Sequence, residues 1–164
     1  MEKAMKLINQ NKAAFYIVST TILIVLACAF SSSVFADEED APYRLYKAAE
    51  NGDMDTVKQL IESGVSVNAE NKSGSYALNA AAFKNNHEMI QLLIENGADI
   101  NSRNRGLDTP LICATKYSTG DEKTVKMLVD AGSDLDAVDE DGKTALDYAQ
   151  KKDQKAAVEL LSQN

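Results

Sequence analysis

Apolar and polar positions recur in a fixed pattern along residues 41–164. In the stretch HEMIQLLIE at residues 87–95, four apolar residues fall on one stripe of a helix with 3.6 residues per turn: Met89, Ile90, Leu93 and Ile94. An alanine-rich stretch at residues 76–84 precedes it and predicts a partner helix. The unit is therefore predicted to be two short helices joined by a turn.

One polar phrase follows the second predicted helix three times, as IESGVSVNAEN, IENGADINSRN and VDAGSDLDAVD. Its glycines, Gly64, Gly97 and Gly132, are 33 and 35 residues apart. Upstream leucines keep a similar spacing at positions Leu45, Leu78, Leu111 and Leu146. Such a period indicates a stack of repeats. Because glycine adopts a left-handed backbone without a steric penalty, we expect each glycine to end a helix.

The repeats are predicted at residues 41–70, 71–103, 104–138 and 139–164. Pro110 after Thr109 favours a helix start, and Thr144 with Asp147 resembles a capping box. The insertion at residues 118–120 accounts for the longer spacing. Since one helix pair cannot bury its own apolar face, neighbouring pairs must cover it.

The first 36 residues differ from the rest of the chain. A lysine-containing start, an uncharged run at residues 13–30 and the sequence SSSVFA predict a secretory signal cleaved after Ala36, followed by an acidic linker at residues 37–40. Two alternatives remain. The apolar run is close to membrane-spanning length and could stay as an anchor, and VLAC resembles a bacterial lipobox, with lipidation at Cys28. All three predict export, with membrane contact only through residues 13–30 or Cys28.

The segments GKTAL at residues 142–146 and GADIN at residues 97–101 resemble the ankyrin repeat. The resemblance covers about residues 41–164. It implies an all-α ankyrin-repeat solenoid of about four units, each a helix-turn-helix plus a projecting β-hairpin. Gly106 lies one residue early in its turn, so we expect the hairpin at residues 103–108 to be distorted.

Charge and residue types narrow the function. From residue 37 onward the chain has 24 acidic and 14 basic residues, which disfavours nucleic-acid binding and favours a basic partner. The single histidine, His87, has no expected catalytic partner. Cys113 is expected to pack as a small apolar residue, and the aspartates at residues 134–141 do not fit a calcium loop. We therefore predict no enzyme activity, no cofactor and no metal site.

The resemblance implies a concave protein-binding face made of hairpin tips and first-helix ends. The expected binding residues are Lys72, Ser75, Phe83, Lys84, Arg103, Arg105, Asp108, Lys116, Tyr117, Glu140, Asp141 and Lys143. Phe83 and Tyr117 are proposed anchors, unless they pack between repeats.

The predicted protein is a monomeric periplasmic module that binds another protein. The resemblance is compatible with an immunity or self-protection protein that blocks a toxin or cell-wall hydrolase. The alternative is an envelope stress factor that supports a periplasmic catalase or another enzyme.

Overall fold

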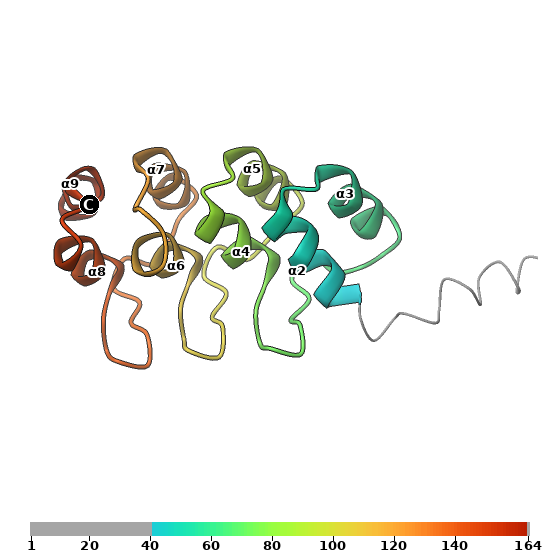
Figure 1. The fold of residues 1–164 in the computed structure, drawn as a ribbon, viewed down its shortest axis with the longest axis horizontal. Helices are drawn as coiled ribbons and strands as arrows, with labels where there is room; N and C mark the ends of the chain where they lie inside the picture. Colours follow the sequence, from blue (N-terminus) through green and yellow to red (C-terminus); the bar gives the residue numbers. More distant parts are fainter. Residues whose placement is uncertain (1–40, 164) are drawn as a thin grey trace, which may run out of the picture. The chain divides into compact units, whose positions relative to one another are not determined.

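Eight short helices make up the part of the chain that the computed structural model describes, residues 41–163 (Figure 1). They are α2 (Ala41–Asn51), α3 (Met54–Glu62), α4 (Ala77–Lys84), α5 (His87–Glu95), α6 (Pro110–Lys116), α7 (Glu122–Asp130), α8 (Ala145–Lys151) and α9 (Lys155–Ser162). All eight lie in one compact unit. The signal, the anchor or lipidation alternatives and the acidic linker lie outside the described residues.

The helices form two layers (Figure 1). In the first layer α2, α4, α6 and α8 pack side by side, and each of them also packs against the helix that follows it in the chain. These followers, α3, α5, α7 and α9, make the second layer. The loops that lead into α4, α6 and α8 project from the first layer, away from the second. The predicted all-α stack of four helix pairs is confirmed.

A continuous core between the helix pairs holds the stack together. Leu45, Leu78 and Leu111 are at most 2% exposed and occupy the same place in three successive repeats. Alanines fill the first helices beside them, which lets neighbouring backbones approach closely. In the described part of the chain, the core residues run from Leu45 to Leu161, so this unit has a hydrophobic core of its own, which is the property of a domain that can fold alone.

The predicted helix boundaries are confirmed. Gly64, Gly97 and Gly132 follow α3, α5 and α7 with φ of +96°, +82° and +93°, a backbone conformation that favours glycine. Thr144 and Asp147 form the capping box at the start of α8, and Pro110 is in the first turn of α6. Short-range sequence signals therefore determine where the helices begin and end.

The projecting loops are turns, and no strand is present in residues 41–163, so the β-hairpin part of the expectation is not confirmed. A backbone bond closes each loop at its base: Asn71 N to Ser75 O, Asn104 N to Asp108 O, and Asp139 N to Lys143 O, at 3.0–3.1 Å. A second bond forms the turn within each loop, for example from Gly74 N to Asn71 O at 2.8 Å. Adjacent loops are joined by the bonds from Arg105 N to Gly74 O and from Glu140 N to Gly106 O.

The expected distortion of the loop at residues 103–108 is wrong. Leu107 occupies the place of Gly74 and Gly142 and takes the left-handed conformation itself, with φ of +61° against +70° and +68°. Its amide makes the same turn hydrogen bond, to Asn104 O at 2.9 Å. The early glycine therefore leaves the loop geometry intact and transfers the backbone strain to a leucine.

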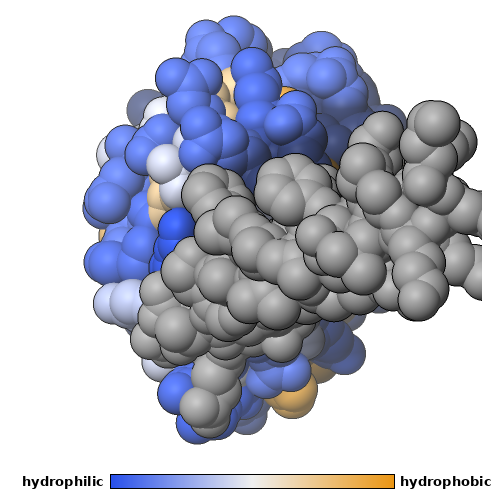
Figure 2. Space-filling view, turned by 90° about the vertical axis from the view of Figure 1, so that its right-hand side faces the viewer, coloured by the Kyte–Doolittle hydropathy of each residue, from blue (hydrophilic) through white to orange (hydrophobic). Residues whose placement is uncertain are grey.

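The end of the stack formed by α2 and α3 is mostly hydrophilic where its surface is visible, with only scattered hydrophobic residues (Figure 2). A polar outer face is what an end repeat needs, since no neighbour covers it. Within residues 41–163, none of the helices has the length and apolar character needed to cross a membrane.

Candidate protein-binding face

The first helices and the loops that lead into them carry the residues predicted to bind a partner. We call this surface the loop face; it comprises α2, α4, α6 and α8 with the loops that lead into the last three. Exposed on it are Lys72, Lys84, Arg103, Arg105, Tyr117, Glu140, Asp141 and Lys143. Ser75, Phe83 and Lys116 are partly buried, and Asp108 is buried.

A hollow of about 210 Å³ opens on the loop face between the first three repeats. It is lined by Tyr46, Ser75, Asn79, Ala80, Phe83, Asn104, Cys113 and Tyr117. Three of these residues are aromatic and come from α2, α4 and the C-terminal end of α6. Small-molecule pockets usually measure about 300–1,000 Å³, so this hollow is the size for a single side chain.

The structure brings the two predicted anchors, Phe83 and Tyr117, to the same hollow. Tyr117 is 51% exposed, although its hydroxyl donates a hydrogen bond to Asp108 Oδ2 at 3.1 Å. Phe83 is partly buried, with the ammonium of Lys84 4.9 Å from its ring centre. Neither ring is enclosed between repeats, so both keep surface available to a partner.

Beside the hollow, the ammonium of Lys116 lies between two buried carboxylates. Lys116 Nζ is 2.9 Å from Asp108 Oδ1 and 2.9 Å from Asp139 Oδ2. The side chains of Asp108 and Asp139 are 2% and 0% exposed, and that of Lys116 is 15% exposed. Tyr148 donates to Asp139 Oδ2 at 2.5 Å. The cluster joins the loops of repeats three and four to α6 and α8.

The contacts in this cluster determine the protonation of its members. Burial alone would raise the pKa of the Asp139 carboxyl, but hydrogen bonds from Lys116, Tyr148 and the Lys143 amide outweigh it and hold that pKa well below its usual value. Burial alone would lower the pKa of Lys116, but its bonds to Asp139 and Asp108 raise it. The bond to Asp139, together with burial, raises the pKa of Tyr148 to about 12.

Two predicted binding residues thus have internal roles. Asp108 was expected at an exposed loop tip, but its carboxylate is buried and accepts from Lys116, Tyr117 and Asn104. Lys116 was expected to face a partner, but both of its short contacts go to carboxylates of its own chain. Of the residues in this cluster, only Tyr117 is exposed, so the cluster lies beneath the loop face and supports it.

The two loop arginines also bind within the chain. Arg105 Nη2 donates to Lys72 O at 2.7 Å, and its side chain lies over Gly74, where an added Cβ would come within 2.2 Å of it. Arg103 Nη2 donates to Val138 O in the next loop. Each arginine therefore ties neighbouring loops together, while its side chain remains on the exposed surface.

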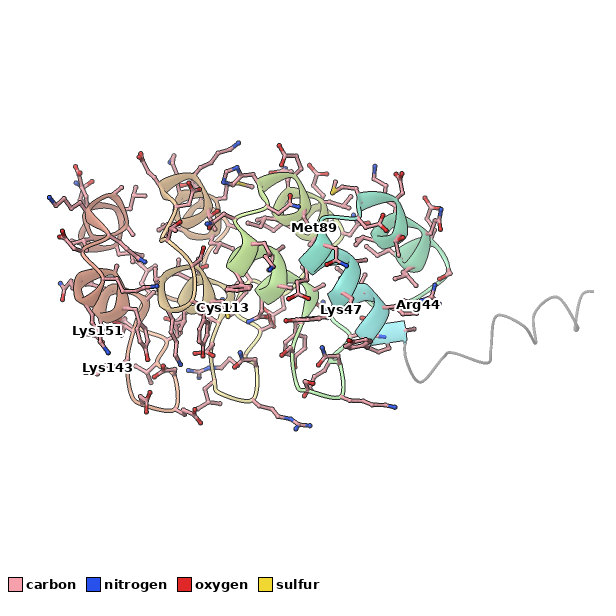
Figure 3. All side chains as sticks on the ribbon, viewed as in Figure 1. Arg44, Lys47, Met89, Cys113, Lys143 and Lys151 are labelled. Carbon is pink, nitrogen blue, oxygen red and sulfur yellow. The ribbon has the colours of Figure 1, made fainter. Side chains whose placement is uncertain are left out.

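A second hollow, of about 310 Å³, lies at the repeat-four end of the loop face. It brings together two predicted residues, Asp141 and Lys143, with Asp147, Tyr148 and Lys151. Lys143 and Lys151 are labelled at this end in Figure 3.

Sequence reasoning did not select Tyr46, Asn79 or Tyr148. The only feature of the sequence that could have indicated these residues is their position, one or two residues after the repeated leucine. At this position the side-chain type changes from one repeat to the next.

The two residues considered for catalysis or redox chemistry, His87 and Cys113, lie outside the loop face or are buried. His87 Nε2 is 2.8 Å from Asp121 Oδ2, a partner that the sequence did not predict, and this pair joins the starts of α5 and α7 in the second layer. Cys113 is 4% exposed, and burial raises the pKa of its thiol to about 12, as expected of a packing residue. Among residues 41–163, no group of three or more His, Cys, Asp or Glu side chains is arranged to hold a metal ion.

The fold and the loop face define a helical-repeat protein with an open, side-chain-rich surface. The family model described as ankyrin repeats (3 copies) matches residues 45–139 and 107–164. The chain therefore belongs to the ankyrin-repeat family, whose repeats generally mediate protein–protein interaction. Among curated proteins, no significant match to this chain was found.

Proposed function

We propose that this protein is an exported, periplasmic binding module that holds a partner protein on its loop face. The observation that carries the proposal is the hollow that receives Tyr46, Phe83 and Tyr117 from three consecutive repeats. Aromatic side chains that converge on a hollow, surrounded by polar and charged residues, have the composition of interface anchors.

The stability of the fold does not account for the exposed part of these rings. The core is built from aliphatic residues and alanines between the layers, and Tyr117 is 51% exposed outside it. The Lys116 cluster joins two loops and two helices beside the hollow and holds the Tyr117 hydroxyl through Asp108. Such contacts lower the entropy cost of binding, since less of the face must be ordered when a partner arrives.

Export is proposed from the sequence of residues 1–36, which has a lysine-containing start, an uncharged run and small residues before Ala36. Within the periplasm, the partner that we propose is a toxin or cell-wall hydrolase that the module blocks. Such a role requires binding alone.

The first experiment tests location and partner together. The full chain with a C-terminal affinity tag is expressed in its own host, and the periplasmic and membrane fractions are analysed by intact mass spectrometry. Cleavage after Ala36 gives a periplasmic species that begins at Asp37, whereas lipidation at Cys28 or an uncleaved anchor gives a membrane species of different mass. The tagged protein is then cross-linked, and its partner is identified.

The second experiment tests the face. Changing Phe83 and Tyr117 to alanine should lower partner capture at least about tenfold, because interface anchors cost more than about 1 kcal/mol each when truncated. The matched control is Gln91→Ala with Met127→Ala, two residues of a shallow hollow on α5 and α7. Equal capture by both variants would refute binding through this face.

A deletion strain distinguishes the two roles that were considered. Sensitivity to a toxin or to autolysis supports the blocking role. Peroxide sensitivity without either phenotype would instead support assistance to a periplasmic catalase.

A further inference from the structure

Charge is divided unequally between the two sides of the stack. The segments that form the first helices and loops, residues 41–52, 69–85, 103–118 and 137–152, contain 10 basic and 7 acidic residues. The segments that form the second helices and the turns after them, residues 53–68, 86–102, 119–136 and 153–163, contain 4 basic and 13 acidic residues. Within residues 41–163, the excess of acidic residues therefore belongs to the side opposite the loop face.

Most carboxylates of the first helices and of the Lys116 cluster are already bound within the chain. Glu50 pairs with Lys47 at 2.5 Å, and Asp108 and Asp139 enclose Lys116. Asp147 accepts from the backbone and hydroxyl of Thr144 at the start of α8. These carboxylates therefore present little negative charge to an incoming ligand.

Three cations of the first helices have no such partner. Among the described residues, no carboxylate lies within 4 Å of the charged groups of Arg44, Lys84 or Lys151. Arg44 lies on α2, Lys84 at the end of α4 beside Phe83, and Lys151 at the end of α8. Arg44 and Lys151 are labelled towards opposite ends of the layer of first helices in Figure 3. Cations without a carboxylate partner in residues 41–163 thus lie along the layer, with the aromatic hollow between its ends.

We propose that the loop face binds a protein segment in which acidic residues flank an aromatic or aliphatic side chain. That side chain enters the hollow between Tyr46, Phe83 and Tyr117, and the flanking carboxylates pair with Lys84 and with the cations towards either end of the face. This inference rests on the proposed function and specifies the chemistry of its partner.

Electrostatics favours this occupant over the alternatives. A basic segment would place its charges against Arg44, Lys84 and Lys151, and like charges across an interface oppose binding. Nucleic acid requires many simultaneous phosphate contacts. Three cations without a carboxylate partner among the described residues are too few for such a ligand, but they suffice for a short acidic segment.

Peptides are selected from a displayed random library against an immobilised protein of residues 37–164. This protein contains every described helix and the whole described core. We expect the recovered peptides to carry net negative charge around one aromatic or aliphatic residue. Their affinity, measured by fluorescence anisotropy on a synthesised peptide, should fall as salt rises, because exposed ion pairs are screened.

Variants then assign the contacts. Lys84→Glu with Lys151→Glu should weaken binding about tenfold or more, equivalent to about 1.4 kcal/mol. Phe83→Ala with Tyr117→Ala should do the same. The matched control, Lys123→Glu with Lys126→Glu on α7, should change affinity less than about twofold, and circular dichroism checks that each variant is folded.

The possible outcomes separate this inference from the proposed function. Recovery of neutral or basic peptides whose binding depends on Phe83 and Tyr117 overturns the acidic partner and leaves the binding face intact. Failure to recover any peptide, or binding that is indifferent to both face variants, overturns both. Lys84-dependent binding of a labelled 20-nucleotide single-stranded DNA that exceeds binding of the peptides would also overturn the inference.

Discussion

Replacing Lys116 by methionine tests how much the buried charge cluster contributes to the stability of the fold. Methionine keeps the length and apolar character of the lysine stem and removes only the ammonium. The change leaves the carboxylates of Asp108 and Asp139, 2% and 0% exposed, without their shared cation. Two aromatic contacts are also lost, since the ammonium lies 5.0 Å and 5.3 Å from the ring centres of Tyr117 and Tyr148.

The expected loss of stability is large. Removing one partner of a buried ion pair costs about 3–5 kcal/mol, because a desolvated charge remains without compensation. Here two carboxylates remain, although backbone amides and tyrosine hydroxyls still bind them. We therefore expect the free energy of unfolding to fall by about 3 kcal/mol or more, a substantial part of the roughly 5–15 kcal/mol of a typical domain.

The assay is urea unfolding followed by circular dichroism at 222 nm. Lys126→Met is the matched control, because Lys126 pairs with Asp130 at 3.1 Å while both side chains are about 60% exposed. Exposed pairs contribute about 0–1 kcal/mol, so this control should change little. Adding Asp139→Asn to Lys116→Met should recover part of the loss. A Lys116→Met effect as small as that of Lys126→Met would refute the reasoning.

The remaining predictions concern pH, backbone strain and capping. Since the folded-state pKa of Asp139 is depressed, its contribution to stability is present above pH 5 and should be lost progressively as pH falls below about 4, measured as the urea midpoint against pH and absent in Asp139→Asn. Since the folded-state pKa of Tyr148 is raised to about 12, its contribution is present below pH 10 and should be lost as pH rises from 10 to 12, an effect absent in Tyr148→Phe. Gly142→Ala should lower the free energy of unfolding by about 1 kcal/mol in the same assay. An added Cβ meets nothing within 4 Å, so the only cost is that of alanine in a backbone with φ of +68°. For the same reason Leu107→Gly should be more stable than Leu107→Ala, and the opposite order would contradict the strain at residue 107. Lys152→Met should lower the thermal midpoint by several degrees, because the Lys152 ammonium caps three carbonyl oxygens at the end of α6, and a variant as stable as the parent would contradict that role.

The helices and their boundaries could be predicted because their causes are local. The stripe of Met89, Ile90 and Leu93 lies within two helical turns, and the glycines and threonine caps act within a few residues of the helix ends. The number of repeats followed from spacing alone. The family could be recognised for the same reason, since a repeated local pattern becomes visible when it occurs four times.

The binding face could be predicted only in part. Phe83 and Tyr117 were selected by their place near the ends of first helices, and stacking brings them to one hollow. Asp108 was assigned to an exposed tip because sequence position does not reveal which way a loop carboxylate turns. Its burial depends on Lys116, eight residues away, and on Asp139 in the next repeat, so it follows from the stacking of whole repeats.

The amino-acid sequence by itself determined the helix pairs, their stops and their period, because hydrophobic periodicity and capping are short-range effects. Only the tertiary structure decided which charges are neutralised and which face solvent. The overall acidity suggested a basic partner, yet the loop face holds most of the cations. The physical reason is that an ion pair depends on distances across repeats, such as that between Lys116 and Asp139, and a sum of charges along the chain contains no distances.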